Sequence, residues 1–103
     1  MAGHFLVITT RGPAWDHSRG RRDQHGWAEH AAFMDALVDE GVVVLGGPLG
    51  DPHEGDHTAL LFRAESEDEI RSRMAADPWS DHLLRIHDVQ PWTLWLRGAG
   101  SPD

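Results

Sequence analysis

The apolar and polar positions divide the chain into a stretch with helical spacing and several continuous apolar runs. Between residues 27 and 40, apolar side chains recur every three or four positions, which places them on one face of a helix. This face consists of Trp27, His30, Met34, Leu37 and Val38. Acidic residues take the opposite face. The pattern predicts an amphipathic helix over about residues 25–40, with one ionisable side chain, His30, in its apolar stripe.

Four other stretches are runs of apolar and β-branched residues, which favour strands buried on both faces. These runs cover residues 4–10, 42–46, 57–64 and about 86–96. Gly41 stands where the first helix would end and suits the left-handed conformation of a helix cap. Residues 48–56 (PLGDPHEGD) are rich in turn-forming residues and predict a hairpin connection between the second and third strands.

A second, shorter helix is predicted after the third strand. Ser66 and Glu69 have the spacing of a capping box, and the helix is expected to run through about Ala76. Asp77-Pro78 should end it, because a residue that precedes proline avoids the α region. Residues 78–84 are expected to add one more helical turn before the last strand.

The predicted order is strand, helix, strand, strand, helix, strand, which is the ferredoxin-like βαββαβ arrangement of the α+β class. It has a four-stranded antiparallel sheet with both helices on one face. Because the strand runs are apolar on both faces, the face opposite the helices needs a cover. We expect a homodimer packed sheet against sheet. The alternative is that some of these apolar residues are simply exposed.

Length and composition bound the possibilities further. With 103 residues we expect a single domain over 1–103, ordered over about 4–97 and loose at 98–103. The sequence contains no cysteine, no apolar run long enough to span a membrane and no signal-peptide pattern, so we expect a cytoplasmic protein. A net charge of −8 argues against nucleic acid as a partner, and the absence of lysine excludes Schiff-base chemistry.

His30 is the first candidate for a functional role. An imidazole within an apolar stripe must satisfy its ring nitrogens, because each unsatisfied group costs about 1–3 kcal/mol. Histidine in general titrates near neutral pH, which suits it to general acid or base catalysis. Two interpretations stay open: a packed side chain bonded to a backbone carbonyl, or a residue of a functional site.

The long connection over residues 11–24 is rich in glycine, proline and arginine, and connections of this length are typically lids, binding loops or disordered. It carries Arg19, Arg21 and Arg22. Arginine binds carboxylate or phenolate groups through two parallel hydrogen bonds, so this cluster, and Arg19 and Arg22 in particular, is a candidate for substrate binding. The alternative is a solvated, mobile cluster of charge.

Three large apolar side chains are candidates for the wall of an aromatic-binding pocket. Trp27 and Met34 share the helical face of His30, and Trp79 directly follows Asp77-Pro78. The alternative for each is a place in the core or at a subunit interface.

No metal site is predicted. The acidic and histidine residues of the hairpin connection stand where polar residues are normally solvated, and no H-E-x-x-H motif is present. These residues are Asp51, His53, Glu54, Asp56 and His57. Gly46 and Gly47 do not form a phosphate loop, since no helix follows them directly. They are expected to let the second strand approach another backbone closely or bend toward a cleft.

The order and spacing of several short features resemble the YCII-related (YciI-like) family. These features are His30, Glu40-Gly41, Gly46-Gly47-Pro48, Asp77-Pro78 and Val89-Gln90-Pro91-Trp92. The resemblance spans about residues 4–97. It implies a ferredoxin-like fold that dimerises as an α+β barrel.

The resemblance also implies a histidine–aspartate pair that lines a cleft, at positions that correspond here to His30 and Asp77. Some related proteins act on chlorinated hydroxyquinones or on other intermediates of aromatic degradation. Asp77 would then orient the imidazole and fix its tautomer. The alternative is that Asp77 only bonds backbone amides at the end of its helix.

We therefore hypothesise a cofactor-free enzyme that uses this pair for acid–base catalysis on a small aromatic or carboxylated metabolite. The expected reactions are of the isomerase or lyase type, such as enolisation or elimination of halide. A covalent intermediate is disfavoured because the sequence has neither cysteine nor lysine. The rival hypothesis is a non-catalytic ligand-binding or accessory domain that keeps the fold and the cleft.

Overall fold

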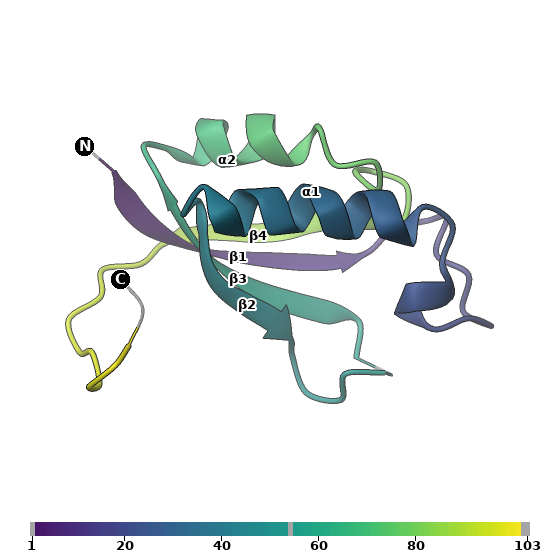
Figure 1. The fold of residues 1–103 in the computed structure, drawn as a ribbon, viewed down its shortest axis with the longest axis horizontal. Coiled ribbons are helices and arrows are strands. Elements are labelled where there is room, and N and C mark those ends of the chain that lie inside the picture. The colour runs from purple at the N-terminus through teal and green to yellow at the C-terminus, as the bar shows by residue number, and fades with distance from the viewer. Residues whose placement is uncertain (1, 54, 102–103) are drawn as a thin grey trace.

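The computed structural model describes residues 2–53 and 55–101, which form one antiparallel sheet and two helices on the same side of it (Figure 1). The elements are β1 (Gly3–Arg11), the single-turn 3-10 helix η1 (Arg21–Asp23), α1 (Trp27–Asp39), β2 (Val43–Pro48), β3 (His57–Ala64), α2 (Glu67–Met74) and β4 (Leu84–Pro91). The strand order is β2-β3-β1-β4. The predicted ferredoxin-like arrangement is confirmed.

The core lies between the sheet and the two helices. Val7 of the central strand β1 is fully buried and pairs with Leu60 of β3 on one side and Val89 of β4 on the other. Phe62 of β3 and Ile70 of α2 are likewise inaccessible to solvent. These side chains form one apolar cluster that holds the helices on the sheet.

The first helix is shorter than predicted at its start and ends as predicted. Gly26 has a φ of 76°, which no helical residue adopts, so α1 begins at Trp27 rather than at residue 25. At the other end Gly41 has a φ of 75°, and its amide donates to the Val38 carbonyl at 3.0 Å. The predicted left-handed cap at Gly41 is confirmed.

The second helix begins with the predicted cap, because the Ser66 hydroxyl accepts from the Glu69 amide at 3.1 Å. It ends at Met74, two residues earlier than predicted. The helical turn predicted for residues 78–84 is wrong: this segment consists of turns, and Asp81 has a φ of 62°. A left-handed residue in this position cannot continue a right-handed helix.

The last strand is also shorter than predicted. β4 ends at Pro91 and not near residue 96, because proline has no amide hydrogen to continue the ladder. The following Trp92 amide makes one more bond, to the His4 carbonyl at 2.9 Å. Trp95 and Leu96 are then 87% and 94% exposed. The tail predicted to be loose includes residues 102 and 103, which lie outside the described residues.

The sheet face opposite the helices carries an apolar patch, here called the distal patch. Strand side chains alternate between faces, so the neighbours of the inward-facing Val7 and Thr9 point away from the helices. The distal patch consists of Leu6, Ile8, Leu45, Ala59 and Leu61, which are paired across β1, β3 and β2. Leu45 is 49% exposed, Leu6, Ile8 and Ala59 are half-buried, and Leu61 is only 7% exposed. No helix among the described residues is long and apolar enough to cross a membrane.

The two glycines of β2 differ in what surrounds them. A Cβ added to Gly46 would lie 2.5 Å from a methyl group of Leu60 and 2.9 Å from the Ala59 carbonyl oxygen. A Cβ added to Gly47 would meet no atom within 4 Å. The close approach to another backbone is therefore confirmed for Gly46. Gly47 makes no such approach, and both glycines line the cavity described below.

We predict that Gly46→Ala lowers the free energy of unfolding by about 1–3 kcal/mol, because β2 must move away from β3 to make room for the methyl group. The matched variant Gly47→Ala should change it by less than about 0.5 kcal/mol. Urea denaturation of both variants measures this. Equal losses in the two variants would contradict the steric explanation.

Candidate functional site

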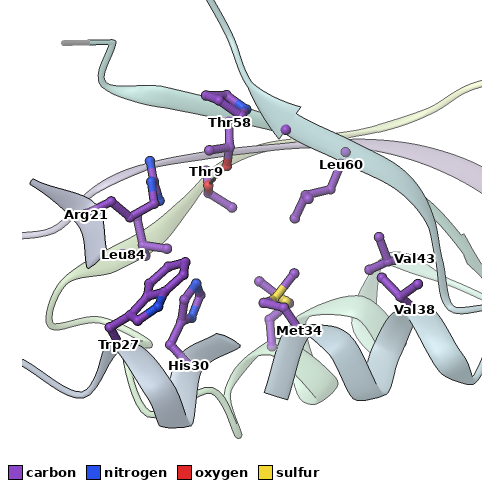
Figure 2. Close-up of a pocket in the computed structure, with 14 residues that line it drawn as sticks. Thr9, Arg21, Trp27, His30, Met34, Val38, Val43, Thr58, Leu60 and Leu84 are labelled. Carbon is purple, nitrogen blue, oxygen red and sulfur yellow. Dashed lines mark hydrogen bonds between the residues drawn. The ribbon is translucent and has the colours of Figure 1, made fainter. Parts of the chain in front are cut away.

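A cavity of about 310 Å³ lies between α1 and the sheet, within the roughly 300–1,000 Å³ that is usual for ligand pockets. Figure 2 shows that its walls are of two kinds. At one end lie the polar groups of Arg21, Thr9, Thr58 and His30, with the flat ring of Trp27 beside them. The other end is closed by apolar side chains only, namely Met34, Val38, Val43 and Leu60.

His30 and Asp77 meet in a buried pair beside this cavity. The His30 Nδ1 atom lies 2.8 Å and 2.9 Å from the two carboxylate oxygens of Asp77. The two residues are only 6% and 5% exposed. An ionised carboxylate accepts hydrogen bonds only, so the His30 Nδ1–H group donates to it. This contact joins α1 to the turn that follows α2.

The turn after α2 places Asp77 by local hydrogen bonds. Its Oδ1 atom accepts from the Trp79 amide at 2.9 Å, which is the pattern of an Asx turn, and its own amide donates to the Met74 carbonyl at 3.0 Å. Pro78 between them fixes the backbone angle. Asp77 therefore bonds a backbone amide and the imidazole at once. The alternative, in which it bonds backbone amides only, is not what the structure shows.

Trp79 packs against one face of the His30 ring and does not line this cavity. Its ring stacks on His30 with centroids 4.0 Å apart and an angle of 6° between the planes. Its indole Nε1–H donates to the His25 carbonyl at 2.8 Å, just before α1 begins. Trp79 is 1% exposed. Together these contacts fix the plane of the His30 ring.

The remaining ring nitrogen of His30, Nε2, is the one available to a ligand. Nδ1 is taken by Asp77, and among the described residues none forms a hydrogen bond with Nε2. His30 contributes to the lining of the cavity, and its ring stands beside that of Trp27, with centroids 5.9 Å apart. A neutral imidazole held in this tautomer has a free electron pair on Nε2, which can accept a proton.

Of the five residues predicted to bind substrate, two line the cavity and three do not. Trp27 and Met34 line the cavity, and Trp79 lies behind His30. Arg19 and Arg22 are exposed and do not line it, and Arg19 pairs with Asp16 at 3.5 Å.

Arg21 is the arginine of the cluster that reaches the cavity, because η1 turns it toward α1 and the sheet (Figure 2). Burial, and to a smaller extent the charge of nearby Arg11, lower the pKa of Arg21. No periodicity of the sequence separates Arg21 from Arg19 and Arg22. The sequence therefore indicated the arginine cluster of the loop but not that Arg21 is the member that lines the cavity.

The loop that carries Arg21 is ordered by a buried glutamine that sequence reasoning missed. The side-chain amide of Gln24, which is 4% exposed, donates to the carbonyls of Asp16 at 2.8 Å and Arg19 at 3.0 Å. Its oxygen accepts from the Asp16 amide at 3.0 Å. Trp15 of the same loop is also buried. These contacts give the loop defined hydrogen bonds and a buried anchor, while Arg19 and Arg22 on it are exposed to solvent.

Two threonines complete the polar end. Thr9 of β1 and Thr58 of β3 are paired neighbours in the sheet, and their hydroxyl groups form a hydrogen bond. Both line the cavity. Only the register of the sheet brings them together, so no local pattern in the sequence predicts this pair.

Metal ligands do not gather here. Among the described residues, no group of three or more histidine, cysteine, aspartate or glutamate side chains is placed to hold a metal ion. Glu54, one member of the hairpin set, lies outside the described residues.

The fold is that of a known dehydrochlorinase. The structure matches 5-chloro-2-hydroxyhydroquinone dehydrochlorinase from Burkholderia phenoliruptrix AC1100, solved in complex with 2,5-dihydroxybenzoquinone, with a TM-score of 0.62. The two sequences are 24% identical, and the match covers 87% of this chain and 93% of that one. Likeness at this identity shows the fold alone. Neither a protein-family model nor a curated protein matches the sequence, so membership of the YCII-related family stays a prediction.

Proposed function

We propose that the chain is a small proton-transfer enzyme in which His30 is the general base and acid and Asp77 orients it. The observation that carries this proposal is the contact of His30 Nδ1 with both oxygens of the buried Asp77, made beside a cavity that His30 also lines. The imidazole bonds this carboxylate, whereas a histidine that only packs in the core was expected to bond a backbone carbonyl.

The chemistry follows from the free Nε2 atom. It takes a proton from an acidic C–H or O–H group of the ligand, while Asp77 accepts the hydrogen bond of the resulting imidazolium. The electron pair left behind moves onto a ligand oxygen as an enolate or phenolate, and return of the proton at another position completes an isomerisation. Where the neighbouring carbon carries chlorine, the pair instead expels chloride. Neither route requires a cofactor.

The ligand class is proposed from the walls and from the fold. An aromatic indole, a thioether and aliphatic side chains suit a planar, mostly apolar molecule of one ring. The matched dehydrochlorinase acts on a chlorinated hydroxyhydroquinone, which agrees with the resemblance of the sequence to the YCII-related family. We therefore propose a cytoplasmic enzyme of that family acting on a small hydroxylated aromatic or quinonoid metabolite.

A second candidate function is a non-catalytic ligand-binding domain. The apolar end of the cavity favours binding of a small ring whether or not any reaction follows. It is lined by Met34, Val38, Val43 and Leu60. The two candidates share the ligand and differ in proton transfer, which is therefore the property to measure.

We predict that the chain accelerates the exchange of the ring C–H hydrogens of 2,5-dihydroxybenzoquinone with deuterated water, followed by NMR. His30→Asn keeps a donor near the Nδ1 position but removes Nε2, and should slow the exchange by about 100-fold or more in protein that circular dichroism shows to be folded. Asp77→Asn should also slow it, because the amide no longer favours the productive tautomer.

The exposed His17→Gln is the matched control and should leave the exchange rate unchanged. Binding of 2,5-dihydroxybenzoquinone without any accelerated exchange would favour the non-catalytic domain. A large loss of stability in His30→Asn together with unchanged exchange would make His30 structural.

We further propose a homodimer in which the distal patch of each chain faces that of its partner. The patch spans three strands and offers a contiguous apolar surface on the side that neither helix covers (Figure 1). In such a dimer the two sheets would be enclosed between pairs of helices, which is the α+β barrel expected from the resemblance.

We predict that Ile8→Asp converts a dimer to a monomer in size-exclusion chromatography with light scattering, because it places a charge in the middle of the distal patch. Ala32→Asp, on the exposed side of α1, is the control and should remain dimeric. A wild-type monomer at micromolar concentration would contradict the sheet-to-sheet dimer.

A further inference from the structure

Arg21 is a partly buried cation without a counter-ion in an apolar cavity. Among the described residues, no carboxylate forms an ion pair with its guanidinium and no acceptor forms a hydrogen bond with it. The guanidinium carbon lies over the Trp15 ring, 5.3 Å from its centroid. Such a group loses hydration without full compensation unless a ligand supplies an anion.

A second arginine lies over the same indole ring and has partners of its own. Arg11 lies over Trp15, at 4.8 Å, pairs with Asp56 at 3.2 Å and donates to the His53 carbonyl at 3.1 Å. The positive charge of Arg11 is thereby balanced. Arg21 has no such partner among the residues that the structure describes, and it faces the cavity (Figure 2).

This arrangement is unusual for so acidic a chain. The net charge is −8, and the 17 acidic residues outnumber the 9 basic ones. The chain therefore has more carboxylates than it needs to pair every arginine. Instead two guanidinium groups converge on one indole ring. Arg11 ends strand β1, and the loop that carries Arg21 is held by hydrogen bonds of Gln24, so ordered backbone positions both guanidinium groups.

We propose that Arg21 binds an anionic oxygen of the ligand, so that the substrate is a ring that carries an ionised phenolate, enolate or carboxylate group. This inference rests on the proposed function and adds the charge of the substrate and the residue that selects it. The anionic oxygen occupies the polar end, beside Thr9 and Thr58, and the ring extends toward Met34. The C–H or O–H group that loses its proton then lies within the part of the cavity lined by His30.

Arg21 also assists the proton transfer in this arrangement. When Nε2 of His30 takes the proton, the electron pair moves onto the ligand oxygen, and negative charge grows where the guanidinium already lies. A fixed cation in a cavity of low polarity stabilises such charge without reorganisation. The same contact therefore selects the substrate and stabilises the intermediate.

The test compares two rings that differ in charge, by isothermal titration calorimetry at low ionic strength. 2,5-Dihydroxybenzoquinone is an anion at neutral pH, and 2,5-dimethoxybenzoquinone is its neutral ether. Wild type should prefer the anion. Arg21→Gln should weaken binding of the anion by about ten- to a hundredfold and leave the ether unchanged. Arg21→Lys should lose less, because it keeps the charge without the planar fork.

Arg22→Gln is the matched control, since it removes the same charge from the adjacent, exposed position. It should bind both rings as wild type does. The inference is overturned if Arg21→Gln keeps the preference for the anion, if it weakens both rings equally, or if Arg22→Gln has the larger effect. Failure of wild type to bind either ring would instead remove the proposed function, and this inference with it.

Discussion

The buried contact between His30 and Asp77 is the interaction on which the arrangement of this domain depends. It joins two side chains 47 positions apart, one on the first helix and one just after the second. An unpaired carboxylate at this depth would be strongly destabilising, so the pair, the Trp79 amide and the stacked indole must form together. Trp79 also bonds the His25 carbonyl just before α1, so the same cluster ties the start of that helix to the turn after α2.

This contact also determines which ring nitrogen of His30 is available in the cavity. Asp77 and Trp79 hold the imidazole from behind, so only its Nε2 side is available to a ligand. Facing it across the polar end is Arg21, held by a loop that Gln24 orders. A base and a cation on opposite sides of one small space suit the removal of a proton from a molecule that becomes, or already is, an anion. The fold alone would not specify this, since the same fold serves many functions.

The parts of the structure that the sequence predicted are those set by local patterns. Helical spacing, the glycine at position 41 and the Ser66 cap each act within a few residues, and each was placed correctly. The errors concern positions where one backbone group overrides a longer pattern. Pro91 ends the last strand although apolar residues continue beyond it, and Asp81 turns the chain where a helical turn was expected.

The candidate site was predictable only in part for the same reason. His30 could be found as an ionisable residue in an apolar stripe, and Asp77 through a resemblance. Arg21 could not be separated from its neighbours, because loop conformation depends on the buried Gln24 and has no periodicity. Thr9 and Thr58 depend on strand register, which no short pattern encodes.

The most direct measurement is the tautomer of His30 and its response to ligand, read from long-range ¹H–¹⁵N correlations of the imidazole. The neutral ring should carry its hydrogen on Nδ1, where Asp77 accepts it, and the Nε2 signal should move when 2,5-dihydroxybenzoquinone is added. A hydrogen on Nε2 in the neutral ring, or an Nε2 signal that does not respond to bound ligand, would contradict the account.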